Sequence, residues 1–141
     1  MNEVRVGVAI AVINEHNQVL IGRRLSPLGL NKFSFPGGHL EFNESIDACI
    51  RRELLEETAI YWNSGTDFIA ISEDIHTDLD KHYVTIFHGV KMGFTPEAKL
   101  TEPDKCECWV WIDIDMLRDM ELFSPVAKLI KSPAWKAFID G

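Results

Sequence analysis

The first long segment of the chain restricts its fold more than any other feature. Residues 4–13 read VRVGVAIAVI, a nearly continuous run of β-branched and small apolar side chains. Such residues favour an extended strand, and a strand without polar alternation is typical of a sheet that is covered on both faces. The run therefore predicts a central strand that is buried on both sides.

The rest of the chain adds further strands and several helices. Strands are predicted from β-branched or alternating segments at residues 19–24, 67–76, 82–92 and 106–112. Helices are predicted at about 44–58, 113–120 and 124–131. Residues 25–38 and 93–105 are rich in Gly, Pro and polar residues and should be mostly loop. The order indicates a mixed-sheet α/β sandwich, with residues 1–141 forming a single domain because no repeat or linker divides them.

Charge and cysteine content argue against several function classes. The chain carries 14 Lys and Arg against 22 Asp and Glu, a formal net charge of −8. Such acidity disfavours nucleic-acid polymers, which need a basic stripe, but allows small phosphorylated substrates when metal ions supply positive charge. No apolar run approaches the roughly 18 residues that span a bilayer, and no export signal is visible. We therefore expect a cytoplasmic protein without membrane contact, whose cysteines (Cys49, Cys106 and Cys108) form no disulfide.

The predicted central helix concentrates acid where a helix tolerates it least. Ile46 and Ile50 should face inward, and Glu53 and Glu57 follow them by seven residues, about two turns. Both carboxylates therefore continue the inward stripe, with Glu56 within reach of Glu53 at i+3. Like charges at this spacing repel by roughly 0.2–0.5 kcal/mol per pair, and carboxylates at the negative helix end cost about 0.3–1 kcal/mol each.

A divalent cation accounts for this cluster better than basic side chains do. Arg51 and Arg52 offset part of the charge, but Arg52 alone cannot satisfy three carboxylates. Hard oxygen ligands at this spacing suit Mg²⁺ or Mn²⁺. A solvated acidic helix face is the alternative. The preceding turn, FPGGHLE at residues 35–41, favours the metal because its two glycines allow close approach of a ligand to the backbone.

The segment from Gly38 to Ile60 resembles the Nudix box, G-x5-E-x7-R-E-U-x-E-E-x-G-U, where U is a bulky aliphatic residue. The positions in register are Gly38, Glu44, Arg52, Glu53, Leu54, Glu56, Glu57 and Ile60. The departure is Ala59 in place of glycine, where a left-handed helix end costs Ala roughly 1 kcal/mol. The segments PGGHLEFNES, KHYVTIF, EPDKCECWVWI and ELFSPV are similar to MutT-type nucleoside-triphosphate diphosphatases, in particular to the human family member that cleaves thiopurine nucleotides.

The resemblance implies a Nudix-type α/β/α sandwich with a mixed central sheet. It also implies hydrolysis of a nucleoside diphosphate linked to another group, so a triphosphate would give a nucleoside monophosphate and pyrophosphate. By similarity, the residues that ligate Mg²⁺ or Mn²⁺ are Gly38, Glu53, Glu56 and Glu57. Glu53 is alternatively the base, and Glu44 and Arg52 would orient the metal-binding carboxylates.

Many members of this family add an acid from outside the box. Glu107 is the first candidate because it should share a strand face with Trp109 and Trp111. Glu102 is the alternative. The competing interpretation of Glu107 is a solvent-facing side chain on a strand.

Contacts with the substrate are expected from Arg23, Arg24, His39, Thr85 and Phe123. The arginines can bind phosphate, and Phe123 can stack on a base, although surface arginine and a core phenylalanine are the alternatives. Ser124 and Pro125 stand where the thiopurine-cleaving relative has Trp and Gly, so the resemblance carries no base preference to this chain. The same relative suggests a homodimer.

Three functions follow from these observations. The leading one is Mg²⁺-dependent hydrolysis of (deoxy)nucleoside triphosphates. The second is a Nudix pyrophosphatase that acts on ADP-ribose or a nucleotide sugar. The third is a non-catalytic module that binds nucleotide as a regulator, which is disfavoured because every acid of the box is present.

Overall fold

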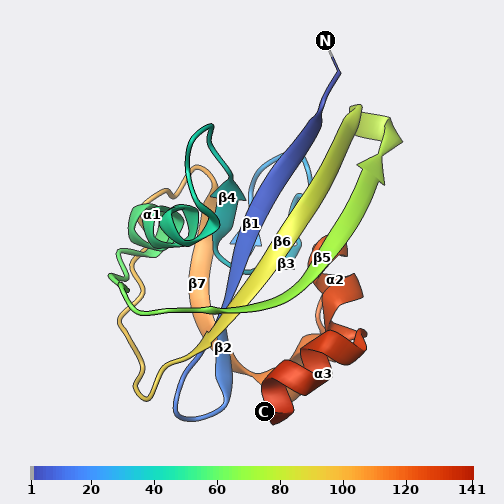
Figure 1. The fold of residues 1–141 in the computed structure, drawn as a ribbon. Coiled ribbons are helices and arrows are strands. Elements are labelled where there is room, and N and C mark those ends of the chain that lie inside the picture. The colour runs from blue at the N-terminus through green and yellow to red at the C-terminus, as the bar shows by residue number, and fades with distance from the viewer. Residues whose placement is uncertain (1) are drawn as a thin grey trace.

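The computed structural model describes residues 2–141 and contains one mixed sheet. Its strands are β1 (Val4–Ile13), β2 (Gln18–Arg24), β3 (Phe33–Ser34), β4 (Gly37–His39), β5 (Asp67–His76), β6 (Lys81–Lys91) and β7 (Cys106–Asp113). The order is β3-β2-β1-β6-β5, with β4 beside β1 and β7 beside β2 (Figure 1). β1 and β6 are parallel and the other pairs are antiparallel, which makes the sheet mixed as expected.

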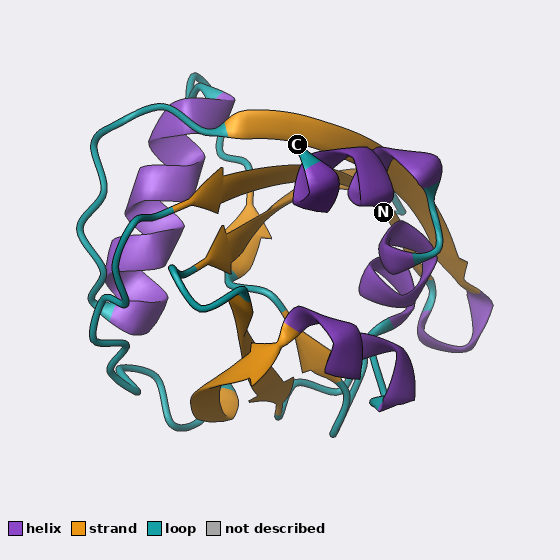
Figure 2. Cartoon of the chain, turned by 90° about the horizontal axis from the view of Figure 1, so that it is seen from below, coloured by secondary structure: helices purple, strands orange, loops and turns teal. Residues whose placement is uncertain are grey.

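Helices cover both faces of the sheet. They are α1 (Ile46–Thr58), α2 (Ser124–Ile130) and α3 (Pro133–Asp140), with short 3-10 helices at Thr77–Leu79 and Ile114–Asp119. Figure 2 shows the long helix, α1, on one side of the strands and short helices on the other. The predicted α/β/α sandwich is confirmed. Among residues 2–141, no helix is long and apolar enough to cross a membrane.

Strand β1 supplies both hydrophobic cores, as its apolar run predicts. Val8, Ile10 and Val12 pack in the core beneath α1. The alternate residues Ala9, Ala11 and Ile13 pack in the core beneath α2 and α3. Successive side chains of a strand point to opposite faces. A strand whose residues 8–13 are all apolar and buried can therefore only be central.

Helix α1 begins two residues later than predicted. Ser45 is its N-cap, and the Ser45 hydroxyl accepts a hydrogen bond from the amide of Ala48 at 3.1 Å. At the other end, Ala59 adopts a left-handed conformation (φ 60°, ψ 17°) and its N–H donates to the carbonyl of Leu55 at 3.0 Å. The cap that glycine would form is therefore present, but with the less favourable residue.

The segment 25–38 is mostly loop, as predicted, and includes β3 and the start of β4, which pair with β2 and β1. One other part of the chain differs from its predicted structure. The C-terminal residues form α3, which was not predicted. Its Trp135 is 3% exposed and stacks on Phe35 with 5.9 Å between ring centroids, so Trp135 is a core residue.

The long loop 93–105 packs against the C-terminal end of α1. The amide of Lys99 donates to the carbonyl of Thr58 at 2.8 Å, and the hydroxyl of Thr101 donates to the carbonyl of Glu56. These bonds satisfy carbonyls that the end of a helix leaves without partners. They also bring residue 102 next to the acidic face of the helix.

We expect Ala59→Gly to stabilise the protein by about 1 kcal/mol, because glycine adopts the left-handed cap without a steric penalty. The free energy of unfolding in urea measures this change. Ala48→Gly, inside the first turns of the same helix, is the matched control and should destabilise by about 1 kcal/mol. Destabilisation by both substitutions would contradict the assigned cap conformation.

Candidate active site

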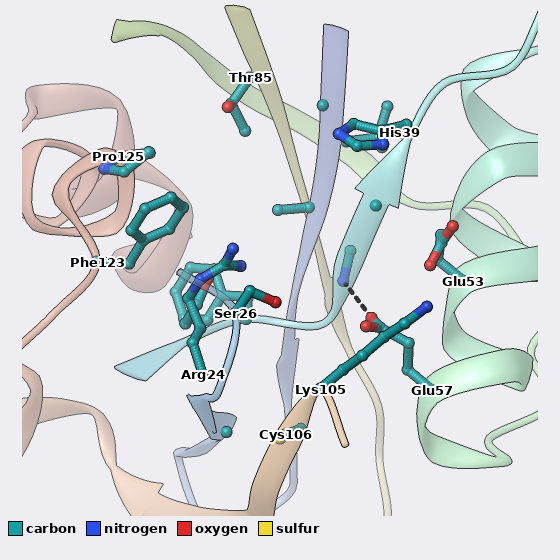
Figure 3. A pocket seen from close by; sticks show the side chains of 18 of the residues that line it. Arg24, Ser26, His39, Glu53, Glu57, Thr85, Lys105, Cys106, Phe123 and Pro125 are labelled. Carbon is teal, nitrogen blue, oxygen red and sulfur yellow. Dashed lines mark hydrogen bonds between the residues drawn. The ribbon is translucent and has the colours of Figure 1, made fainter. Parts of the chain in front are cut away.

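A cavity of about 490 Å³ opens beside α1, lined by residues of the sheet and its loops. Figure 3 shows Glu53, Glu57 and Lys105 on one side of it and Phe123 and Pro125 on the other. We call the first side the acidic end; its carboxylates belong to Glu53, Glu56, Glu57 and Glu102. We call the second side the aromatic end; it contains Arg24, Leu28, His76, Phe123 and Pro125.

The glycine pair of β4 sets how closely the sheet approaches α1. A Cβ atom on Gly38 would lie 2.3 Å from Cδ of Glu53, so the Glu53 carboxylate rests directly on the backbone of Gly38. A Cβ on Gly37 would lie 2.3 Å from the carbonyl oxygen of Val8, so Gly37 is needed for pairing with β1. The amide of Gly37 also donates to Oε1 of Glu57 at 2.8 Å. The turn thus positions two carboxylates of the acidic end.

Arg52 holds the acidic side chains from the opposite side. Its Nε and one terminal nitrogen bond both oxygens of Glu44, at 2.6 and 2.9 Å. The other terminal nitrogen bonds Glu53 at 2.6 Å and Glu56 at 3.3 Å. The bond from Arg52 lowers the pKa of Glu44 to about 2. Glu44 does not line the cavity, so it positions Arg52 rather than a ligand.

Burial leaves the acidic end short of positive charge. Burial raises the pKa of Glu57 to about 8, although the amide of Gly37 opposes the shift. Burial also raises the pKa of Glu53, despite the neighbouring guanidinium of Arg52. The indole of Trp109 covers this end of the helix and donates to the carbonyl of Glu57 at 3.0 Å. Removing carboxylates from water disfavours their charged form, so added positive charge would stabilise this end of the cavity.

The donor set suits a hard divalent cation. Within residues 2–141, no group of three or more His, Cys, Asp or Glu side chains is already gathered closely enough to hold a metal ion. The oxygens of Glu53 and Glu57 instead accept bonds from Arg52 and Gly37. Carboxylates of one cavity wall, two of them with raised pKa values, are nonetheless the ligands that Mg²⁺ and Mn²⁺ prefer. The residues therefore fit the predicted metal.

The aromatic end combines flat rings with a guanidinium. Cζ of Arg24 lies 4.2 Å from the centroid of the Phe123 ring, and Nε of Arg24 donates to the carbonyl of Leu28 at 2.9 Å. The ring of His76 is nearly parallel to Phe123, with 6.2 Å between centroids. Phe123 lines the cavity and is absent from both hydrophobic cores. This arrangement favours contact with a ligand over the core alternative.

The middle of the cavity wall comes from β4 and β6. His39 stacks on Tyr83 with 5.5 Å between centroids, and Nε2 of His39 shares a hydrogen bond of 2.9 Å with the Tyr83 hydroxyl. Thr85, two residues after Tyr83, also lines the cavity. The structure therefore brings together Arg24, His39, Thr85 and Phe123 from the predicted substrate-binding set.

Two predicted site residues lie elsewhere. Glu107 and Arg23 form an exposed ion pair of 2.7 Å and do not line the cavity. The pairing of β2 with β7 runs from Gly22↔Trp109 to Arg24↔Cys106, so β7 contains an extra residue at this point. Such a bulge breaks the alternation of side chains, and Glu107 consequently loses the face it was expected to share with Trp109. Glu102, the alternative acid, does line the cavity.

Tyr83, Lys105 and His76 are polar lining residues that were not assigned to the site from the sequence. Tyr83 lies on the strand face of Thr85, so period-two alternation from Thr85 would have found it. Lys105 lies inside the segment EPDKCECWVWI, but its side-chain direction depends on the turn at 102–105. His76 carries no motif that marks it in the sequence, and its stack on Phe123 shows that it borders the cavity.

The fold and the acid-lined cavity agree with a family-level comparison. A NUDIX domain matches residues 3–132, so the chain belongs to the Nudix family. It is similar to the 8-oxo-dGTP diphosphatase of Escherichia coli K12, with 38% identity over 61 residues, 43% of this chain and 46% of that protein. It is also similar to the m7GpppN-mRNA hydrolase NUDT17 of Danio rerio, with 28% identity over 82% of this chain and 43% of that protein. The match spans less than half the length of either curated relative.

Solved structures agree on the fold. The crystal structure of a MutT NUDIX hydrolase from Burkholderia pseudomallei superimposes with a TM-score of 0.79. The two chains are 22% identical, and the match covers 91% of this chain and 97% of that one. At this identity the likeness establishes the Nudix α/β fold with its mixed sheet and flanking helices.

We expect the metal-free protein to lose stability as the pH rises, in part because of Glu57. The pKa of Glu57 is about 8 in the folded chain and near 4.5 when unfolded, so folding takes up a proton between these values. The contribution of Glu57 to the free energy of unfolding therefore falls as the pH rises from about 4.5 to 8, by on the order of 1 kcal/mol per pH unit. Urea unfolding of wild type and Glu57→Gln in a chelating buffer, at pH 5 to 8, measures it.

The difference in unfolding free energy between wild type and Glu57→Gln isolates the contribution of Glu57. Glu57→Gln should gain stability relative to wild type as the pH rises. Glu97→Gln, an exposed carboxylate on the loop after β6, is the matched control and should follow wild type. A pH-independent difference between wild type and Glu57→Gln would show that Glu57 is already charged in the folded protein.

We expect Gly38→Ala to lose metal affinity and Gly37→Ala to lose stability. The new methyl group of Gly38→Ala meets the end of a side chain and displaces the Glu53 carboxylate, whereas that of Gly37→Ala meets backbone. Gly38→Ala should therefore keep most of its stability and bind Mn²⁺ at least about tenfold more weakly. Gly37→Ala should lose about 2 kcal/mol or more of stability. Calorimetric Mn²⁺ titration and thermal unfolding separate the two effects, and unchanged Mn²⁺ affinity in Gly38→Ala would contradict the role of Glu53.

Proposed function

We propose that this protein is a Mg²⁺- or Mn²⁺-dependent hydrolase that converts nucleoside triphosphates to nucleoside monophosphates and pyrophosphate. The observation that carries the proposal is that the cavity beside α1 has an acidic end and an aromatic end. A base and a polyphosphate need these two environments at opposite ends of one molecule. The likeness to the 8-oxo-dGTP diphosphatase supports the same reaction class.

The position of each residue in the cavity indicates its role in the proposed hydrolysis. Water is added across the anhydride between the α and β phosphates, which breaks the bridging P–O bond and releases pyrophosphate. Mg²⁺ or Mn²⁺ held by the carboxylates of the acidic end would supply positive charge to the phosphate oxygens and lower the pKa of the attacking water. Glu53 is the candidate acceptor of the water proton, because it is buried and rests against Gly38. Arg52 keeps this carboxylate in place through its bond of 2.6 Å.

Glu56, Glu57 and Glu102 are the remaining candidate ligands. All three line the acidic end, and the loop carrying Glu102 is fixed to α1 by the bond from Thr101 to Glu56. In this proposal Glu102 takes the place first assigned to Glu107. The Gly38 carbonyl stays a further candidate, because β4 and α1 meet at this residue.

Base preference, oligomeric state and cellular location are secondary parts of this proposal. A purine or thiopurine preference depends on the aromatic end, where Phe123 and His76 offer flat surfaces to any base. A homodimer and a cytoplasmic location rest on the sequence alone. The net charge of −8 argues against extended contact with RNA, so we rank a small nucleotide above a capped transcript as the substrate.

We expect a nucleotide panel with Mg²⁺ to release pyrophosphate, and not single phosphates, from one or more triphosphates. The panel contains the natural deoxynucleotides, oxidised and thiopurine forms, ADP-ribose, a nucleotide sugar and a cap dinucleotide. Glu57→Gln should lower kcat by about 100-fold or more, with Glu97→Gln as the active control. Orthophosphate alone from every triphosphate would reject the proposal, and faster cleavage of ADP-ribose would transfer it to that substrate class.

A further inference from the structure

Lys105 is a cation of the cavity to which the proposed reaction assigns no role. Its backbone is fixed at the end of the loop before β7: the amide donates to the carbonyl of Glu102, and the carbonyl accepts from the amide of Leu25, both at 2.9 Å. The next residue, Cys106, pairs with Arg24 in the ladder of β2 and β7. Lys105 and Arg24 therefore start from neighbouring backbone positions, and both line the cavity.

From this shared origin the two side chains diverge. Arg24 turns to the aromatic end, where it bonds Leu28 and covers the face of Phe123. Lys105 extends toward the acidic end, where its ammonium pairs with Glu102 (Figure 3). The two cations thus lie at opposite ends of the cavity.

The hydrogen-bonding capacity of Lys105 is largely unused. Arg52 directs its donors to Glu44, Glu53, Glu56 and the carbonyl of His39, so it has little left for a ligand. Lys105 makes one side-chain contact with the described residues, an ion pair of 3.3 Å with Glu102. Its ammonium has three donors, and its side chain is 61% exposed. The Lys105 side chain can therefore move to bind an anion without breaking other hydrogen bonds or core packing.

The order of groups along a nucleotide decides which part meets Lys105. With the base at the aromatic end and the α–β anhydride at the carboxylates of α1, the terminal phosphate lies farthest from Phe123. Lys105 and Phe123 are on opposite sides of the cavity in Figure 3. A terminal phosphate carries the highest charge of the chain, and a compact ammonium on a flexible stem is suited to bind it.

We propose that Lys105 binds the terminal phosphate of a nucleoside triphosphate and thereby selects triphosphates over diphosphates. This inference rests on the proposed function, since it assumes that the phosphate chain lies along the acidic end. The competing explanation is structural: Lys105 only balances the charge of Glu102. A structural role would affect triphosphate and diphosphate alike.

The test compares equilibrium binding of the α,β-methylene analogues of one nucleoside triphosphate and its diphosphate, with Mg²⁺ present. Wild type, Lys105→Met and Lys105→Arg are compared by calorimetry. Lys99→Met, an exposed lysine on the same loop that does not line the cavity, is the matched control. Lys105→Met should weaken triphosphate binding by about tenfold, as expected for one charge-assisted bond. Diphosphate binding should change by less than about twofold, and Lys105→Arg should restore part of the difference.

Equal weakening of both analogues, or no weakening, would overturn the assignment, as would failure of wild type to prefer the triphosphate. The proposed function fails separately, when wild type releases no pyrophosphate from any triphosphate. Because the analogues are not cleaved, their binding decides the role of Lys105 in either case.

Discussion

The contact between the Glu53 carboxylate and the backbone of Gly38 is the constraint on which the site depends. Gly38 belongs to a short strand that pairs with β1, and Glu53 belongs to the helix that covers the same strand. The contact therefore links the central strand, the turn and the helix at one point. A side chain at Gly38 would displace the Glu53 carboxylate from this point, since even a Cβ atom would overlap it. The short distance is possible only because glycine has no Cβ.

Arg52 offsets the repulsion between the crowded carboxylates of α1. A buried carboxylate without a partner is unstable, and three acids on adjacent turns repel each other. A guanidinium has a planar set of donors that can serve several carboxylates at once. Here that set joins Glu44 at the start of the helix to Glu53 and Glu56 near its end. Arg52 thus stabilises the helix and aims its acids in the same arrangement, while Glu57 depends on the amide of Gly37.

Much of this arrangement could be predicted from the sequence, and the failures have local causes. The apolar run of β1 predicted a strand buried on both faces, and the seven-residue spacing placed Glu53 and Glu57 on the inward side of α1. Periodicity succeeds in such regular elements. It failed for Glu107, because a bulge in β7 shifts the alternation. It could not place His76, which stacks on the sequence-distant Phe123, or Lys105, whose direction depends on the irregular turn at 102–105.

The distribution of charge explains how so acidic a chain can bind an anion. Positive charge inside the cavity comes from Arg24, Arg52 and Lys105, each on a different element and each with a different neighbour. Arg52 is saturated by carboxylates, and Arg24 is directed to an aromatic ring. The protein alone therefore offers a polyphosphate little more than Lys105, so most of the attraction has to come from dications held by the carboxylates. Affinity for the phosphate chain would then depend on metal, whereas discrimination between phosphate chains of different length would depend on Lys105, whose ammonium has a single protein partner within residues 2–141, Glu102.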